Sequence, residues 1–287
     1  MYLNPFTFHQ PTTISEAARL LANSPHSKLV AGGSFLINNL KQLKRRGMKT
    51  PGHIISLKNI IELKGIAVDH QKLVIPSMTT IREILECPSL DDNFRILKNA
   101  AKNIATTPIR NTATIGGNLT CRYTWTEMPA VMIALEADFH FIGADNHEHT
   151  LSAENFFKNG AKTDKILSHI TILRDKNAAL VYARVRRSGY VDIPLLSVCL
   201  KTAFEKNSLT KTCLAINNSV EFAQRDTKLE NFLNQRPIFQ ELPQEALDHL
   251  HEAIYNTRAD DYKKYIFRVT LKNALAELIQ KKPGILK

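Results

Sequence analysis

The sequence has few cysteines, and none of them follows a pattern that binds metal or forms disulfides. Four cysteines occur in 287 residues, far apart, without a Cys-x-x-Cys pair and without histidines at metal-ligand spacing. They predict neither a zinc site nor a disulfide framework, and they fit a reduced, cytoplasmic compartment. The four are Cys87, Cys121, Cys199 and Cys213.

Long apolar runs and the common nucleotide-binding motifs are also lacking. No run approaches the ~18 consecutive apolar residues that indicate a membrane-spanning helix. The first residues, MYLNPFTFHQPTT, have no basic region followed by an apolar core. We therefore expect neither secretion nor a membrane span. The P-loop pattern and the GxGxxG dinucleotide fingerprint are absent, which excludes those two classes of nucleotide site.

Basic residues outnumber acidic ones, 38 against 27, so the formal net charge is +11. Clustered lysine and arginine are the electrostatic mark of nucleic-acid binding. The densest run, residues 41–49, holds five basic residues, and Arg184, Arg186 and Arg187 form a second group. Neither group is interleaved with aromatic residues or set in a recognition-helix pattern. A solvated surface that steers toward an acidic partner is the favoured interpretation, and no nucleic acid is expected.

The order of hydropathy patterns predicts an α+β protein of two domains. In the first half, helices are predicted over 12–24, 35–46, 79–88, 93–104 and 127–137, strands over 28–31 and 53–57, and hairpins over 61–77 and 138–153. In the second half, strands are predicted over 166–173, 178–187 and 194–204, with a possible fourth near 212–216, and helices over 226–235, 243–257 and 260–281. We therefore predict a first domain of residues 1–165, with sublobes of about 1–55 and 56–165, and a second domain of residues 166–287.

Two Gly-Gly corners carry no acid, base or nucleophile. The first, LVAGGSFLINNL at 29–40, leads from a strand into a helix, and the second is ATIGGNLT at 113–120. Glycine reaches positive φ and lets another group approach the main chain closely. A corner at the start of a helix presents unpaired N–H groups and the positive end of the helix dipole, which suits a phosphate. Each corner alone is more often a simple chain reversal, but together they favour a diphosphate held between main-chain groups.

The segments around these corners resemble, in order and through nearly the whole chain, the FAD-binding subunit of the molybdenum hydroxylases. The most specific match is PIRNTATIGGNLT, and the others are LVAGGSFLINNLKQ, HIISLKNIIELKGIAV, MPAVMIALEA, FFKNG, KILSHITI and DDYKKYIFRVTLKNAL. This family includes flavoprotein subunits of carbon monoxide, nicotinate and xanthine dehydrogenases. The resemblance implies a two-lobed FAD-binding domain of the vanillyl-alcohol oxidase (PCMH) type. A C-terminal domain with an antiparallel sheet and helices, as in the CO dehydrogenase flavoprotein, would follow it.

By this resemblance the first loop holds the FAD pyrophosphate with main-chain N–H groups, and the second contacts the pyrophosphate and the ribityl side. No catalytic residue and no metal ligand is implied, because a flavin that relays electrons carries the chemistry itself. The implied cofactor-binding residues are Ala31, Gly32, Gly33, Ser34, Phe35 and Leu36 in the first loop, Ala113, Thr114, Gly116, Gly117 and Asn118 in the second, the apolar residues Ile104 and Leu167, and the acid Glu127.

The segment after the second corner departs from the family pattern. Most members have small residues there, followed by an aspartate that reaches the cofactor's sugar chain, whereas this sequence reads LTCRYTWTE over 119–127. Glu127 takes the acidic position with a longer arm. Arg122, Tyr123 and Trp125 are bulkier than the residues expected there. They would repack the ribityl pocket, line a partner surface or exclude the flavin.

The resemblance implies an FAD-dependent oxidoreductase subunit that relays electrons from the iron–sulfur clusters of a partner to an acceptor such as NAD or a quinone. Its partners would be an iron–sulfur subunit and a molybdopterin-binding large subunit, in a heterotrimer that is often doubled. The large subunit would choose the substrate. The alternative is a family member that has lost FAD and serves as a binding or scaffold protein.

Ten histidines occur, and three of them fall in or near one predicted turn. His147 and His149 lie in the sequence DNHEH, and His140 lies in the strand before it. Alternating histidines in a hairpin resemble a metal-binding spacing. A polar tip between two strands is the favoured interpretation, so no metal site is predicted.

Overall fold

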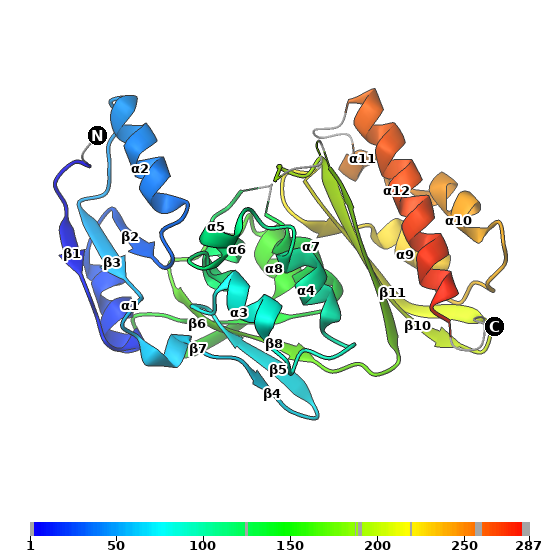
Figure 1. Cartoon of the computed structure of the whole chain (residues 1–287), viewed down its shortest axis with the longest axis horizontal. Helices are drawn as coiled ribbons and strands as arrows, with labels where there is room; N and C mark the ends of the chain where they lie inside the picture. The colour runs from blue at the N-terminus through cyan, green and yellow to red at the C-terminus, as the bar shows by residue number, and fades with distance from the viewer. Residues whose placement is uncertain are drawn as a thin grey trace.

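The computed structural model describes residues 3–123, 126–186, 188, 191–218, 220–255 and 260–282. Three sheets follow one another, and each organises one part of the molecule: an N-terminal lobe, a middle region and a C-terminal region. Figure 1 shows these parts in a row, with the start of the chain at one end and its last helix at the other. Within the described ranges, no helix combines the length and the apolar character needed to cross a membrane.

The N-terminal lobe is a small parallel sheet with two helices. Its elements are β1 (Thr7–His9), α1 (Ile14–Asn23), β2 (Ser27–Val30), α2 (Leu36–Arg45) and β3 (His53–Ser56). The strand order is β1-β3-β2, and both neighbouring pairs run parallel. The Thr13 side chain begins α1 by accepting a hydrogen bond from the Glu16 amide, as the capping pattern predicts.

The middle region is built on a five-stranded antiparallel sheet. Its elements are the 3-10 helix η1 (Ile61–Leu63), β4 (Ala67–Val68), β5 (Lys72–Pro76), α3 (Ile81–Glu86), α4 (Arg95–Ala101), α5 (Thr107–Arg110), α6 (Ile115–Thr120), α7 (Met128–Ala134), β6 (Asp138–Ile142), β7 (Glu148–Ser152), α8 (Ala153–Lys158) and β8 (Ile166–Leu173). The strand order is β4-β5-β8-β6-β7, so β8 is the central strand. In Figure 1 the short helices of this region stand over one face of the sheet.

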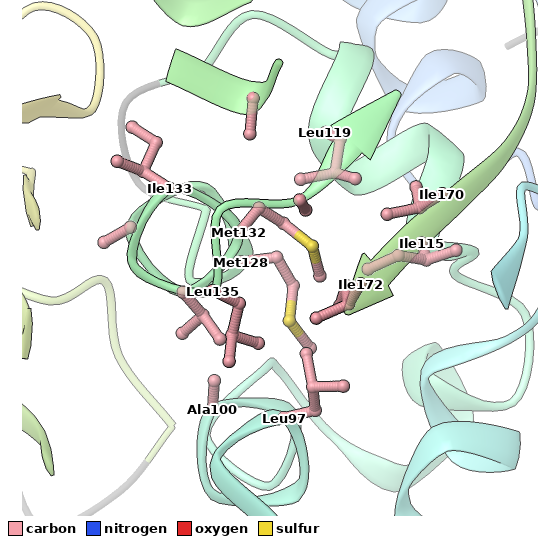
Figure 2. Close-up of a cluster of buried hydrophobic side chains, with 14 of the residues drawn as sticks. Leu97, Ala100, Ile115, Leu119, Met128, Met132, Ile133, Leu135, Ile170 and Ile172 are labelled. Carbon is pink, nitrogen blue, oxygen red and sulfur yellow. The ribbon is translucent and has the colours of Figure 1, made fainter. Parts of the chain in front are cut away.

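Helix α7 lies in the interior of the molecule, and all of its residues are buried. Figure 2 shows Met128 and Met132 pointing toward Ile172 of the middle sheet, with Ile115 and Leu119 of α6 in the same cluster. The helix that carries the second Gly-Gly corner is therefore anchored in the core. This packing fixes the position of α6, because a close-packed interior admits few alternative arrangements.

The C-terminal region is a four-stranded antiparallel sheet with helices. Its elements are β9 (Ala178–Val185), β10 (Leu196–Glu205), β11 (Ser208–Asn217), β12 (Gln224–Arg225), α9 (Thr227–Leu233), α10 (Leu242–Glu245), the 3-10 helix η2 (Ala246–His249), α11 (Glu252–Tyr255) and α12 (Asp261–Gln280). The strand order is β12-β11-β10-β9. The sheet contacts α7 on one side and α12 on the other.

Two of the cysteines are small core residues of this sheet. Cys199 of β10 and Cys213 of β11 belong to the hydrophobic cluster around α7. Their strand neighbours Leu200 and Leu214 belong to the cluster that includes α12, as expected when successive residues face opposite sides of a sheet. Burial raises the pKa of the Cys213 thiol to about 12, which keeps it protonated and unreactive.

The structure moves the predicted domain boundary. The prediction starts the second domain at residue 166, but β8 pairs with β5 and β6 and so belongs to the middle sheet. The chain enters the C-terminal sheet only at β9. Consecutive strands are usually neighbours in space, which favours grouping residues 166–173 with the strands that follow. Here the strand instead returns to partners made much earlier in the chain.

Strand β1 and the helix predicted over 243–257 are also different in the structure. Strand β1 is not predicted, because three residues are too few to show a hydropathy period. The helix predicted over 243–257 is divided into α10, η2 and α11. Asp226 lies at this break, where it accepts hydrogen bonds from the His251 amide at 3.0 Å and the Tyr255 hydroxyl at 2.5 Å. A tertiary contact therefore overrides the local pattern. Residues 256 and 257 of that prediction lie outside the described ranges.

Candidate functional site

The first Gly-Gly corner presents main-chain donors without acceptors. It joins β2 to α2, and Gly33 adopts the left-handed conformation with φ +66°. In the described structure, the amides of Gly32, Gly33 and Ser34 donate no hydrogen bond. Phe35, at the N-cap of α2, supplies no side-chain cap. The amides and the positive end of the α2 dipole together suit an anion.

The second corner uses its amides within the protein. The Gly116 amide donates to the Ser77 carbonyl oxygen at 2.9 Å, and the Gly117 amide donates to Thr114 Oγ1 at 3.1 Å. The expectation of unpaired amides is therefore wrong for these two glycines. A Cβ on Gly116 would lie 2.7 Å from Cβ of Ser77, so the close approach of two backbones already accounts for glycine here.

The two corners lie against each other. A Cβ placed on Gly32 would be 1.6 Å from the carbonyl oxygen of Thr112 and 3.2 Å from Cα of Ala113. The N-terminal lobe and the middle region therefore meet at main-chain contact distance. As a result, the unpaired donors of the first corner lie beside the start of the second.

Asn118, at the end of the second corner, carries an unsatisfied polar atom. Its main-chain amide donates to the Thr114 carbonyl oxygen at 2.9 Å. Its side-chain Oδ1 is buried and accepts no hydrogen bond from any described residue. Leaving such an acceptor unpaired costs about 1–3 kcal/mol. A ligand hydroxyl that donates to this oxygen would remove the cost.

Tyr123 connects the segment after the second corner to the first. Its ring packs on Phe35 with centroids 4.3 Å apart, and its hydroxyl accepts a hydrogen bond from Asn39 Nδ2 at 2.9 Å. Arg122 turns toward α8, where its Nε donates to the Gly160 carbonyl oxygen at 3.1 Å. Trp125 lies outside the described residues.

Glu127, predicted to reach the cofactor's sugar chain, points toward the C-terminal sheet. The residue is 2% exposed. One carboxylate oxygen accepts from Arg184 Nε at 2.6 Å and the other from the Tyr182 hydroxyl, and Arg184 also pairs with Asp192 at 2.7 Å. Burial raises the pKa of Glu127, while Tyr182 and Arg184 act to lower it. Each carboxylate oxygen thus has a partner in β9, and the contact of Glu127 with a cofactor's sugar chain stays a prediction.

The two apolar residues predicted near the cofactor are core residues in this structure. Ile104 is 9% exposed and Leu167 is 5% exposed. Both belong to the cluster around α7, and Leu167 pairs with Phe141 in the middle sheet. Their nearness to a cofactor stays a prediction. The remaining predicted residues lie in the two corners or directly beside them: Ala31, Leu36, Ala113 and Thr114.

Thr112 and Ser77 shape the site, and the sequence prediction omits both. The carbonyl group of Thr112 lies against Gly32, and Ser77 lies against Gly116. Thr112 directly precedes the predicted second loop, so its position in the sequence could have identified it as a residue of the site. Ser77 belongs to another segment of the chain, and no local pattern marks it.

The unpaired polar groups of these corners, three donors and one acceptor, fit a flavin dinucleotide. Three unpaired amides beside a helix start match a negatively charged pyrophosphate. The buried Oδ1 of Asn118 matches a sugar-type hydroxyl that needs an acceptor. Neither contact requires a lysine or a metal ion.

Comparison with known proteins points to the same kind of ligand. Residues 4–174 match the family model described as the FAD binding domain in molybdopterin dehydrogenase. The chain is 33% identical over 181 residues to the carbon monoxide dehydrogenase medium chain of Hydrogenophaga pseudoflava, which covers 63% of this chain and 58% of that one. It is 26% identical over 256 residues to caffeine dehydrogenase subunit beta of Pseudomonas sp. (strain CBB1), which covers 87% of this chain and 85% of that one. The first match thus spans less than two thirds of that relative's length.

The likeness of the folds extends further than the likeness of the sequences. A solved structure of carbon monoxide dehydrogenase from Hydrogenophaga pseudoflava superposes with a TM-score of 0.87 at 27% identity. The superposition covers 97% of this chain and 98% of that one. It therefore includes the C-terminal region, which the family model does not match.

Proposed function

The chain belongs to the family of FAD-binding domains of molybdopterin dehydrogenases, and on this premise we propose that it relays electrons within a molybdenum hydroxylase-type complex. It is an FAD-binding subunit of the oxidoreductase class. When bound, FAD supplies the redox chemistry that would connect iron–sulfur clusters of a partner subunit with an acceptor such as NAD. The protein's own residues bind and orient this cofactor.

The first corner holds the pyrophosphate in this proposal. The amides of Gly32, Gly33 and Ser34 donate to its oxygens, and the dipole of α2 adds to the attraction. Thr112 sets the distance between the corners, because it lies against Gly32. Asn118 accepts a hydrogen bond from the ribityl side. The other predicted loop residues contribute shape through their backbone.

The contact between Gly32 and Thr112, beside three unpaired amides, is the observation that carries the proposal. It supports an anion site at the contact between the N-terminal lobe and the middle region. We assign the N-terminal lobe and the middle region to the two lobes of a PCMH-type FAD-binding domain. Glu127 acts as a positioning residue in this arrangement, because it ties the chain after the second corner to the C-terminal sheet.

The proposed partners are an iron–sulfur subunit and a molybdopterin-binding large subunit, in a heterotrimer that can double. Support comes from the relatives, one named as a medium chain and another as a subunit beta. The large subunit would select the substrate in such a complex. We place the complex in the cytoplasm, which the four free cysteines support.

A second candidate is a scaffold subunit that has lost FAD. The contact of Tyr123 with Phe35 and Asn39 favours it, because a bulky ring then occupies space beside the first corner. In that case Tyr123→Ala, which removes the ring, would restore FAD binding to a chain that otherwise lacks it.

Titration of the purified chain with FAD separates the two candidates. The flavoprotein is expected to carry flavin absorbance as isolated, or to bind FAD reversibly with one molecule per chain. Absence of both in the wild-type chain would refute the proposal. The relay is tested in the assembled complex, where reduction of the iron–sulfur partner should bleach the flavin absorbance. An unbleached flavin would restrict the chain to FAD binding.

Replacement of Asn118 by leucine tests the contact with the ribityl side. Leucine keeps the approximate size and removes the unsatisfied oxygen, so the FAD-free protein should become about 1 kcal/mol more stable. The affinity for FAD should fall about tenfold, which corresponds to about 1.4 kcal/mol. Urea unfolding and FAD titration measure the two effects. Unchanged FAD affinity in Asn118→Leu would exclude the contact.

A further inference from the structure

A polar row lies on the face of the middle sheet that turns away from the core around α7. Along β6, Phe139 and Phe141 belong to that core, and His140 between them faces the opposite side. His169 of β8 lies directly opposite His140 in the antiparallel ladder. Glu148 comes from β7, the neighbour of β6 on its other side. Three adjacent strands thus contribute one side chain each.

The atoms of these three side chains that can bind a metal ion lie close together. Nδ1 of His140 lies 3.0 Å from Oε1 of Glu148. The imidazole rings of His140 and His169 stack with centroids 4.2 Å apart. One donor atom from each side chain lies within 4.8 Å of the other two, and no other group of three or more such residues occurs in the described part of the chain.

Hydroxyl groups orient both imidazoles. Ser168 Oγ donates to the main-chain carbonyl oxygen of His140 at 2.9 Å, so it accepts from Nδ1 of His169, 3.0 Å away. His169 therefore keeps its lone pair on Nε2. Thr171 Oγ1 forms a hydrogen bond of 2.9 Å with Nε2 of His140. Metal-binding histidines are commonly held through the second ring nitrogen in this way.

We propose that His140, His169 and Glu148 bind a divalent transition-metal ion such as Zn²⁺. Two imidazole nitrogens and one carboxylate oxygen suit such an ion, and water completes the coordination. The row belongs to the middle sheet and uses none of the residues that the flavin proposal requires. Success or failure of the two proposals can therefore be told apart.

Binding requires modest side-chain movement. Donor atoms around a tetrahedral zinc ion lie about 3.3 Å apart, because the Zn–N and Zn–O bonds are about 2.0–2.1 Å long. The Glu148 side chain is 49% exposed and can rotate toward the histidines. The stacked rings are nearly parallel, with 2° between their planes, and must turn so that their lone pairs converge. The sheet backbone need not move.

The proposed site takes Glu148 from the DNHEH sequence but uses neither of its histidines, His147 and His149. His149 pairs with Asp145 at 3.3 Å, and its side chain is 45% exposed. It lies in the same hairpin as His140 but outside the proposed ligand set. His149→Gln is therefore a matched control for His140→Gln and His169→Gln.

Calorimetric titration of the tag-free, EDTA-treated full chain with Zn²⁺ tests the proposal. We expect one ion per chain in the wild type. His140→Gln and His169→Gln should each weaken binding at least about tenfold, while His149→Gln should leave it unchanged. Zn²⁺ should also raise the unfolding temperature of the wild type but not of the two ligand variants.

Three results would overturn the site. These are a wild-type chain that binds no Zn²⁺, a His169→Gln variant that binds as the wild type does, and a His149→Gln variant that loses as much affinity as His169→Gln. Circular dichroism checks that each variant is folded. If a histidine variant does not fold, Glu148→Gln decides, because this half-exposed residue can be changed without disturbing the core.

Discussion

Gly32→Ala is expected to lose most of its FAD. The new Cβ would stand 1.6 Å from the carbonyl oxygen of Thr112. No change of rotamer relieves this overlap, because both atoms are fixed to the main chain, so the two corners must separate. The amides of Gly33 and Ser34 would then leave the pyrophosphate. We expect FAD affinity to fall about 100-fold or more, equivalent to about 2.8 kcal/mol. FAD titration, followed by flavin fluorescence, measures the loss.

Gly52→Ala is the matched control for this substitution. A Cβ at Gly52 meets no atom within 4 Å. Its effect on stability should therefore stay within about 0.5 kcal/mol, with FAD affinity unchanged. Gly32→Ala protein that retains wild-type FAD affinity would show that the contact between the corners is not needed for binding. A comparable loss in both variants would point to a general effect on folding.

Glu127→Ala should give the largest loss of stability among the charge substitutions considered. Its carboxylate is 3% exposed and its partner Arg184 is 6% exposed, so the substitution leaves a buried guanidinium with Asp192 as its remaining acidic partner. Removing one member of a buried pair costs about 3–5 kcal/mol. We expect about 3 kcal/mol, since Asp192 still offsets part of the charge. Urea unfolding of the FAD-free chain measures it.

Glu86→Ala provides the exposed counterpart. Glu86 pairs with Arg82 at 2.9 Å, but the two side chains are 61% and 47% exposed. Such a pair contributes about 0.3–0.5 kcal/mol at most. Tyr182→Phe, which removes only one hydrogen bond to Glu127, should cost about 1 kcal/mol. Equal losses in Glu127→Ala and Glu86→Ala would refute the anchoring role of Glu127.

The helices and strands of this fold could be predicted wherever the hydropathy of the sequence shows a clear period. The hairpins of β4 with β5 and of β6 with β7 agree with the sequence prediction, and the strand over 166–173 coincides with β8. Their alternating side chains report burial on one face, which is a local property. Which strands pair with one another, in contrast, does not follow from the local sequence. The domain boundary was therefore misplaced, since only the pairing of β8 with β5 and β6 assigns it to the middle sheet.

The two Gly-Gly corners of the candidate site also have similar local sequences but different hydrogen-bond partners. Both corners contain a Gly-Gly pair, yet the amides of Gly32 and Gly33 are unpaired within the described residues while those of Gly116 and Gly117 are used. The Gly116 amide donates to the carbonyl oxygen of Ser77, which lies in a distant segment, whereas the Gly117 amide donates to Thr114 Oγ1 within the same corner. Glu127 is a similar case, because Tyr182 and Arg184 come from a distant strand.

The order of residues along this chain was enough to indicate its family, its cofactor and the two loops that meet. These depend on short motifs whose chemistry is carried by neighbouring residues. Folding in three dimensions settled which donors stay unpaired, that Gly32 lies against Thr112, and that His140 faces His169. Such facts depend on contacts between segments far apart in the chain, and the energy of those contacts is not encoded in either segment alone.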